Sequence, residues 1–286
     1  MAGIINKNQR KQNRAADIII FSVLSAGAVT MVFPFFWMLS TALKDSKSVF
    51  AYPPTLIPYP LIWQNFIDIW RVVPLFNGLK NSFIVSSCVV LFGTVSSTMA
   101  AFSYSKLRFP CKNLFFMLLL STMMIPFAVL LIPLFVMYSA VGWIDTLLPL
   151  IVPGMLGNVT MIFFLRQFMN GLPNELMESA KIDGCGYPRI YAGIYLPLCG
   201  PAIAANVILL FMATWNDYLG PLIFTHSPSI ATVQVVIASF NTFYKDQMNF
   251  AFVMAASLIA ILPVLILFIT CQKYFVDSFV MSGIKG

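Results

Sequence analysis

Long stretches without a charged residue dominate this chain of 286 residues. Six of them are long enough to cross a bilayer, because a transmembrane helix needs roughly 20 apolar residues. Only 9% of the residues are charged and 59% are hydrophobic, a composition that excludes an ordinary soluble domain. We therefore expect an all-α polytopic membrane protein with a six-helix transmembrane domain over residues 17–272. The charge-free runs are Ile18–Leu43, Asn81–Ser105, Asn113–Ile144, Thr146–Leu165, Ile190–Asn216 and Gln247–Gln272.

The positions of the basic residues predict the orientation, whereas the net charge of +7 reports no substrate. If the N-terminus is cytoplasmic, twelve of the seventeen Lys and Arg residues fall in cytoplasmic segments, as the positive-inside bias requires. This predicts a cytoplasmic N-terminal segment over 1–16, a cytoplasmic tail over 273–286 and a cytoplasmic loop over 172–198. The first apolar run is longer than a signal-peptide core and lacks an Ala-x-Ala cleavage site, so we interpret it as an anchor.

The stretch Glu175–Pro197, within loop 172–198, is the longest charged interruption between two apolar segments. Its spacing predicts a short amphipathic helix. Gly184 suits the C-terminal stop of that helix, and Tyr187-Pro188 can open a second one. We expect a helix-turn-helix on the membrane surface. The apolar positions of the first helix are Leu172, Leu176, Met177 and Ala180, and its charged positions are Glu175, Glu178 and Lys181.

The same loop resembles the coupling motif of the membrane subunits of ATP-binding-cassette importers, which reads E-A-A, three residues, G, nine residues, I-x-L-P. All spacings match, and the one departure is a Ser in place of the central Ala. The resemblance implies the permease fold of type I importers and a coupling helix that docks in a groove of a cytoplasmic ATPase. An ordinary amphipathic connector is the alternative, but it explains no fixed spacing. The matching residues are Glu178, Ser179, Ala180, Gly184, Ile194, Leu196 and Pro197.

The fifth run ends in a cluster of polar and aromatic residues, Trp215, Asn216 and Asp217. A carboxylate at the edge of hydrocarbon is costly unless it faces water or a partner, so these residues are candidates for the translocation pathway. An interfacial position just emerging into water explains Asp217 equally well. The cluster is also similar to a segment of the sugar-importing branch of the family, in which aromatic faces suit sugar rings.

Two outer segments and the C-terminus have proposed partners. Residues 45–79 are rich in Pro and interfacial aromatics and predict a loop on the outer face. Residues 231–240 are apolar, too short to cross, and of strand or interfacial character. In this family such outer loops receive a solute-binding protein, although a plain connector explains residues 45–79 as well.

The terminus, with Gly283, Lys285 and Gly286, is similar to the tail that inserts between the ATPase subunits of maltose-type importers, and contact with anionic lipid is the alternative.

Small residues and prolines predict how the spans pack and bend. Gly93, Ser97, Ala101 and Ser105 recur every fourth residue, which predicts a stripe where a neighbouring helix approaches closely. Pro126 and Pro133 fall within the third run and predict two kinks in it.

The inventory of reactive residues excludes several classes of function. There is one His, the five Cys form no CxxC pair, and neither a Walker A pattern nor a nucleophile elbow is present. We expect a non-catalytic subunit with no metal, no bound cofactor, no disulfide and no nucleic-acid partner. Energy must then come from a partner.

The resemblance implies the partners and the place. They are a second homologous permease subunit, two ATPase subunits that bind ATP and Mg, an extracytoplasmic solute-binding protein and membrane lipid, in the bacterial inner membrane. We expect a sugar or oligosaccharide as substrate, with glycerol phosphate or another polyol as the alternative. An ion-coupled secondary transporter would need intramembrane charges in repeated halves, and a membrane enzyme would need clustered His, Asp or Glu.

Overall fold

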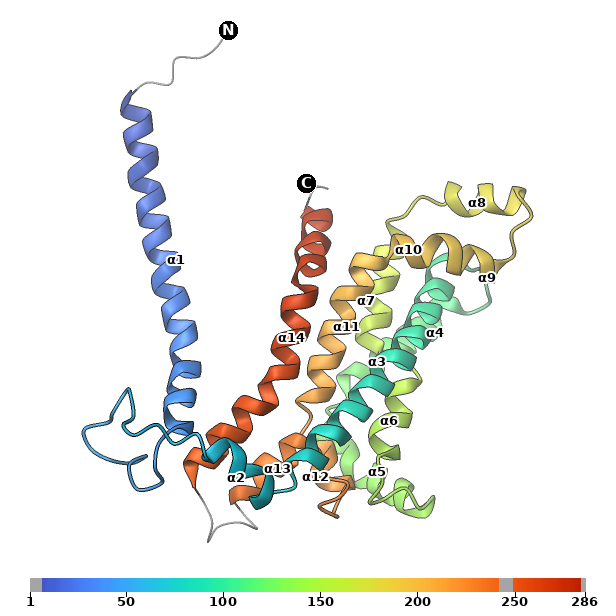
Figure 1. The fold of residues 1–286 in the computed structure, drawn as a ribbon. Coiled ribbons are helices and arrows are strands. Elements are labelled where there is room, and N and C mark those ends of the chain that lie inside the picture. The colour runs from blue at the N-terminus through green and yellow to red at the C-terminus, as the bar shows by residue number, and fades with distance from the viewer. Residues whose placement is uncertain (1–6, 242–248, 284–286) are drawn as a thin grey trace. The chain divides into compact units, whose positions relative to one another are not determined.

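The computed structural model describes residues 7–241 and 249–283, which divide into two compact units. Of the described residues, unit 1 comprises 7–69 and 249–259, and unit 2 comprises 70–241 and 260–283. The described residues form helices and no strand (Figure 1), which confirms the predicted all-α class. Four helices are long and apolar enough to cross a membrane, and two bent pairs raise the number to six if each pair is one span.

Unit 1 contains the first span and the segment after it. The end of α1 is fixed by side-chain hydrogen bonds, because Asn65 Nδ2 donates to the carbonyls of Ala42 at 2.8 Å and Lys44 at 2.9 Å. The predicted outer loop is irregular up to Gln64 and then contains a helix, α2, which was not predicted from the sequence. The elements are α1 (Lys7–Ala42), α2 (Asn65–Val72), which continues into unit 2, and the first part of α14 (Phe250–Gly283).

Unit 2 is built around α3, which packs against α6, α7, α11 and α13. Its helices in chain order are α3 (Leu75–Lys106), α4 (Lys112–Ser121), η1 (Thr122–Met124), α5 (Phe127–Ala140), α6 (Leu148–Met155) and α7 (Val159–Asn170). They continue with α8 (Glu175–Ile182), α9 (Tyr187–Ile190), η2 (Tyr191–Tyr195), α10 (Leu196–Leu198), α11 (Gly200–Trp215), α12 (Leu219–Phe224), α13 (Val233–Ala238), η3 (Ser239–Asn241) and the rest of α14.

The predicted stripe of small residues on α3 is the surface on which α6 and α7 pack. A Cβ atom added to Gly93 would lie 2.6 Å from the Gly154 carbonyl oxygen, so only glycine fits there. One turn on, Ser97 Oγ accepts from the Asn158 backbone N–H at 2.8 Å. At the end of α3, Ser105 Oγ donates to Asn170 Oδ1 at 2.8 Å. The prediction of close packing along this stripe is confirmed.

The third and fifth charge-free runs each form two helices that meet at a sharp bend, and not one continuous helix with a kink. The third run breaks at Pro126, where α4 with η1 and α5 meet at 99°. Ile125, the residue before the proline, is extended, as proline requires of its predecessor. Pro133, by contrast, lies inside α5. The fifth run bends by 78° at Cys199, and α11 begins at Gly200.

In the segment at 231–240, for which the sequence predicted strand or interfacial character, residues 233–238 form the helix α13, so the strand alternative is wrong and the interfacial one stays a prediction. Val233 and Val236 lie one turn apart on α13 and are both buried. They face Gly78 of α3, where an added Cβ would approach Val236 Cγ2 to 2.9 Å. Burial of one valine face against a glycine in α3 therefore overrides the strand preference of β-branched residues.

Candidate functional site

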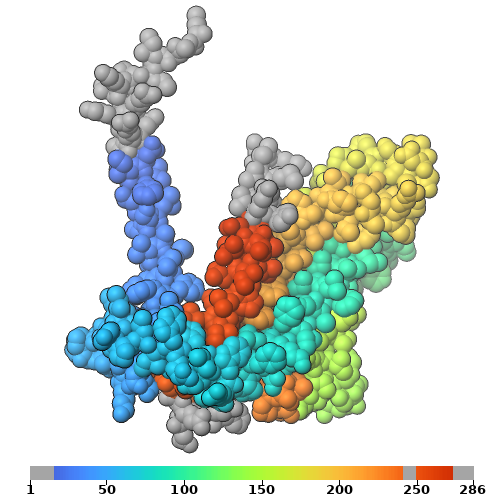
Figure 2. All heavy atoms as spheres, viewed as in Figure 1, coloured from blue at the N-terminus to red at the C-terminus, as the bar shows by residue number. Residues whose placement is uncertain are grey.

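The loop with the importer motif folds as the predicted helix-turn-helix, α8 followed by α9. It lies at the end of unit 2 where α3 and α7 end, shown in yellow in Figure 2. Glu175 and Glu178 occupy the first turn of α8, where a negative charge favours the helix dipole. The backbone N–H groups of Met177 and Glu178 donate to the Asn174 carbonyl at 3.0 and 3.1 Å.

The turn between the two helices depends on Gly184. This residue has a φ of +78°, a conformation that favours glycine. Its N–H donates to the Lys181 carbonyl at 3.0 Å, and the Cys185 N–H donates to the Ala180 carbonyl at 2.9 Å. This pair of bonds is a Schellman motif, which satisfies the last carbonyls of α8. The predicted stop is confirmed, and it fixes the direction in which the chain leaves α8.

The second half of the motif forms an irregular helix. Pro188 lies in the first turn of α9, where its missing N–H costs nothing. The following segment η2 is a π-helix, and the Leu196 N–H donates to the Tyr191 carbonyl five residues before it. Pro197 comes directly afterwards and has no N–H to continue an α-helical ladder. Leu196 and Pro197 thus lie where α9, η2 and α10 lead into the bend at Cys199.

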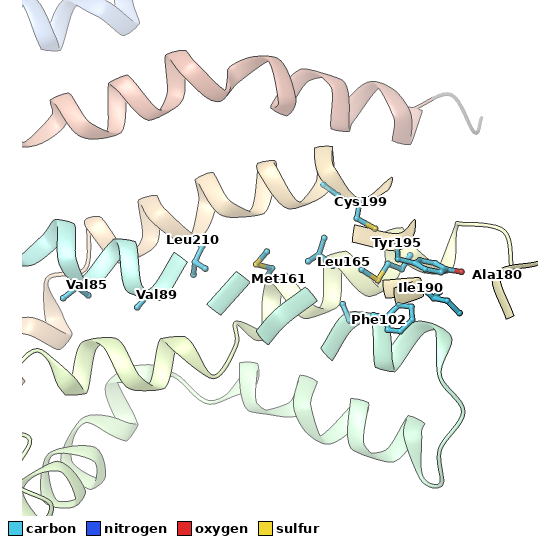
Figure 3. Packing of buried hydrophobic residues seen from close by; sticks show 13 residues of the cluster. Val85, Val89, Phe102, Met161, Leu165, Ala180, Ile190, Tyr195, Cys199 and Leu210 are labelled. Atoms are coloured by element: carbon cyan, nitrogen blue, oxygen red, sulfur yellow. The ribbon is translucent and has the colours of Figure 1, made fainter. Parts of the chain in front are cut away.

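The motif residues divide into an anchored set and an exposed set. Ala180 is buried, as are Ile190 and Tyr195 near it, and Figure 3 shows them continuous with the core between α3, α7 and α11. Ile194 is partly buried against the same core. Glu178, Ser179 and Gly184 are exposed. One side of the loop is therefore built into the bundle and the other side is free to contact a partner.

The exposed side of the loop also carries apolar side chains. Ile182 is 87% exposed and Tyr187 47% exposed. Lys181 Nζ lies 4.8 Å from the centroid of the Tyr187 ring, a cation–π contact that joins α8 to α9. Apolar side chains beside two carboxylates give the surface the mixed character of a protein-docking site.

Lys106 is a functional candidate that the sequence did not identify, since there it counts only among the basic residues that predict the orientation. This last residue of α3 is buried, and its Nζ donates to the Leu172 carbonyl at 2.8 Å and to Asn174 Oδ1 at 2.9 Å. The Asn174 side chain is thereby used for α3 and makes no capping bond to α8. The Nζ atom also lies 5.4 Å from the Tyr195 ring centroid. One ammonium group thus joins α3 to both sides of the loop.

Aromatic contacts connect η2 to the middle of the bundle. The Phe102 ring centroid lies 5.5 Å from that of Tyr191 and 5.2 Å from that of Tyr195. Thr98 Oγ1 and the Tyr191 hydroxyl are hydrogen-bonded at 2.8 Å. A displacement of α8 and α9 would therefore be transmitted to α3 through side chains that are already in contact.

The predicted pathway residues have different surroundings. Trp215 is buried, its Nε1 donates to the Ala260 carbonyl at 3.0 Å, and its ring stacks on Phe211. Asn216 is exposed and its Oδ1 accepts from Gln234 Nε2 at 3.2 Å. The contacts of Trp215 with Phe211 on α11 and Ala260 on α14 explain its burial without a solute. The Asn216 side chain, by contrast, is exposed to solvent. A role of the three residues in the pathway stays a prediction.

Asp217 is half-buried beside α12. Burial raises the pKa of the Asp217 carboxyl, and hydrogen bonds from the backbone N–H groups of Gly220 and Leu219 oppose that rise. The bond from Gly220 is 3.3 Å long. The Asp217 carboxylate, one residue before the N-cap Tyr218, thus accepts from backbone N–H groups in the first turn of α12.

The end of unit 2 opposite α8 holds a second carboxylate. Asp145 lies between α5 and α6 at a φ of +60°. Its carboxylate accepts hydrogen bonds from the backbone N–H groups of His226 and Ser227, both at 2.8 Å, and from the Ser227 hydroxyl. These bonds join the α5–α6 loop to the segment before α13.

The C-terminal candidates are only partly described. Gly283 is the last residue of α14, so the predicted tail continues the helix for eleven residues, 273–283, beyond the expected end of the span at Gln272. Lys285 and Gly286 lie outside the described residues. Insertion of this tail between ATPase subunits stays a prediction.

A family model and several curated relatives match this chain, and all of them describe membrane components of transport systems. Residues 93–280 match the family described as "Binding-protein-dependent transport system inner membrane component". The arabinooligosaccharides transport system permease protein AraQ of Halalkalibacterium halodurans is 34% identical over 262 residues, which cover 91% of this chain and 93% of that protein. The sn-glycerol-3-phosphate transport system permease protein UgpE of Yersinia pestis is 32% identical over 278 residues, covering 95% and 99%. The lactose transport system permease protein LacG of Rhizobium radiobacter is 29% identical over 273 residues, covering 95% and 97%.

A solved structure shares the fold. It is the crystal structure of a bacterial ABC transporter involved in the import of the acidic polysaccharide alginate, and one of its chains matches with a TM-score of 0.80. The sequence identity is 19%, and the match covers 96% of this chain and 100% of that chain. This chain therefore shares the fold of that chain.

Proposed function

This chain belongs to the family of binding-protein-dependent transport system inner membrane components, and we propose that it forms half of the translocation pathway of an ATP-driven importer for a sugar or oligosaccharide. Members of the family are membrane components of transport systems, so the chain is a permease subunit and not an enzyme. The observation that carries the proposal is the α8–α9 helix-turn-helix, which exposes Glu178 and Ser179 while Ala180 is buried in the core.

The choice of a sugar rests on the relatives. The names of two of them specify arabinooligosaccharides and lactose, and the third specifies sn-glycerol-3-phosphate. Glycerol phosphate or another polyol is therefore retained as the alternative solute. Because selectivity in such systems begins at the solute-binding protein, thermal-shift screening of that protein against sugars and glycerol phosphate distinguishes the two.

The coupling role of the loop follows from how it is held. We infer that the exposed side of α8 docks in a groove of an ATPase subunit, as the motif implies. The Schellman turn at Gly184 keeps α8 and α9 at a fixed angle, so a push on α8 is passed to α9. Lys106 and the Phe102–Tyr195 contact then pass it to α3. Closure of the ATPase subunits on ATP would in this way bias the bundle between its two access states.

The other subunits are proposed from the family and from what the sequence lacks. A second permease, two ATPase subunits that bind ATP and Mg, and an extracytoplasmic solute-binding protein complete the transporter. We place it in the bacterial inner membrane with both termini and α8 in the cytoplasm, since the segments on that side carry most of the Lys and Arg residues.

The test compares Gly184→Val with Gly184→Asn in the complete transporter reconstituted in vesicles. A β-branched residue at a φ of +78° costs about 1–3 kcal/mol, whereas Asn tolerates this conformation. A Cβ at this position meets no atom within 4 Å, so the backbone conformation alone separates the two variants. We expect Gly184→Val to lose most ATP-dependent sugar uptake and solute-stimulated ATPase activity, and Gly184→Asn to retain most of both.

Two outcomes would contradict the proposal. One is wild-type uptake and stimulation in Gly184→Val, which would show that the angle between α8 and α9 is irrelevant. The other is solute accumulation by this chain alone under an ion gradient, which would assign it to secondary transport.

A further inference from the structure

A polar cavity of about 570 Å³ opens at the α8 end of unit 2, between the α3–α4 turn and the end of α7. Three basic side chains line it, Arg108, Lys112 and Arg166, and no Asp or Glu is among its lining residues. The proposed coupling surface does not include this cavity, and no motif residue lines it. Three positive charges around one cavity indicate an anionic ligand.

Neutral groups hold two of these three charges in place. Lys112 Nζ donates to the carbonyls of Ser105 at 3.1 Å and Leu107 at 2.9 Å. Arg166 Nε donates to the Tyr104 carbonyl at 3.1 Å, and its guanidinium lies 3.9 Å from the Phe116 ring centroid. Carbonyls and a ring orient cations without neutralising them. The positive charge of the cavity is therefore built in.

The cavity lies at the depth of lipid headgroups. Two candidate spans, Leu75–Lys106 and Leu148–Asn170, end at its lining, and the first helix of a bent pair, Lys112–Met124, begins there. Span ends mark the boundary between hydrocarbon and the polar interface. The anions present at this depth of a bilayer are the headgroups of its anionic lipids.

The rim of the cavity is apolar on the side of α4. Leu114 lines the cavity and is 51% exposed, and Phe115 and Leu118 on the same helix are 52% and 54% exposed. A basic cavity that continues into an exposed apolar helix face matches an amphiphile with an anionic head and acyl chains. Inorganic phosphate would use only the basic part.

We propose that this cavity binds the phosphate-bearing headgroup of an anionic phospholipid, with the acyl chains lying along α4. Arg and Lys at the end of transmembrane helices recognise such headgroups, and Arg166 and Arg108 supply the planar donor groups that suit phosphate oxygens. The lipid belongs to the leaflet on the α8 side, which is the cytoplasmic leaflet in the orientation proposed above. A lipid bound here would lie beside the Lys106 end of α3.

The test uses the complete transporter in phosphatidylcholine nanodiscs that contain a photoactivatable phosphatidylglycerol. Mass spectrometry of the crosslinked chain is expected to place the label within residues 104–118. Arg108→Gln is the principal variant, because Arg108 is exposed and its replacement leaves the core intact. Removing one basic residue is expected to reduce labelling roughly fivefold. Lys80→Gln, an exposed cation at the other end of α3, is the matched control and leaves labelling unchanged.

Two further measurements keep the test decisive. Arg166→Lys, which keeps the charge but not the planar donor group, is expected to retain more labelling than Arg166→Gln. Millimolar inorganic phosphate does not displace the lipid. Equal labelling by a phosphatidylcholine probe, undiminished labelling of Arg108→Gln, or loss of labelling in inorganic phosphate would each overturn the proposal, the last by showing a site for a free anion.

Discussion

The two ends of unit 2 are held together by different interactions. At the α8 end, the loop is attached by packing of Ala180 and Ile190 into the continuous core and by the buried ammonium of Lys106. At the opposite end, the segments between helices are held by polar side chains that bind backbone groups, chiefly Asn81 on α3 and Asp145 in the α5–α6 loop. A displacement at the α8 end therefore enters the core, whereas a displacement of one outer loop is resisted locally.

This difference predicts which substitutions uncouple transport from ATP hydrolysis and which only lower the stability of the permease. Residues at the α8 end should change the number of solute molecules imported per ATP. Residues at the opposite end should change stability and the response to the solute-binding protein, while ATP hydrolysis and transport stay linked.

The largest effect is expected for Lys106→Met. The variant removes two charge-assisted hydrogen bonds, to Leu172 and Asn174, while keeping the side chain's length. Hydrogen bonds to charged groups contribute about 1.5–3 kcal/mol each, so we expect solute imported per ATP to fall roughly tenfold or more. The measurement is uptake and ATP hydrolysis in the same vesicles. Lys106→Arg keeps the charge and should retain most of the coupling, and an unchanged ratio in Lys106→Met would remove the contrast between the two ends.

A smaller effect is expected for Asn81→Leu at the opposite end. Asn81 Nδ2 donates to the carbonyls of Ser229 and Ala231, both at 2.9 Å, and leucine of similar shape leaves both carbonyls without this donor. An unpaired buried polar group costs about 1–3 kcal/mol. The apparent Tm in detergent should fall by several degrees, while solute imported per ATP stays the same. Asn77→Leu, one turn earlier on α3, is the control, and a fall in coupling without a fall in Tm would contradict the assignment.

Local signals predicted the α8–α9 loop well. Gly184 marked the turn because its position after an amphipathic run calls for the left-handed conformation that it adopts. The stripe from Gly93 to Ser105 was equally readable, since a four-residue repeat of small side chains depends on helical periodicity alone. Both features are set by residues close to one another in the chain.

Features that depend on distant residues were not predicted. The bond from Lys106 to Leu172 joins positions 66 residues apart, and nothing near Lys106 indicates its partner. The valines of α13 favour a strand by propensity and become helical because Gly78 of α3 leaves room for them. Pro126 predicted a kink, but the break is 99°, and the two sides of it contact different elements, α4 contacting α7 and α5 contacting α12. Trp215 was assigned to the pathway from its type and position, whereas its bond to Ala260 is a matter of tertiary structure.

The smallest effect is expected for Asp145→Asn. Hydrogen bonds lower the pKa of the Asp145 carboxyl, first those from the Ser227 hydroxyl and backbone N–H and then that from the His226 N–H. A lowered pKa in the folded state means that the charged form contributes stability above the unfolded pKa, about 3.9 for Asp, and that this contribution is lost as the pH falls through the folded value.

Asn tolerates the φ of +60° and keeps one acceptor, so the variant removes mainly the charge. The difference in Tm between the wild type and Asp145→Asn should be small and constant above about pH 5, and should shrink below about pH 4. Tm measured in detergent across this range tests it. A difference that stays the same at low pH would mean that the α5–α6 loop is held by geometry alone, and the opposite end of unit 2 would then resemble the α8 end more closely than its hydrogen bonds indicate.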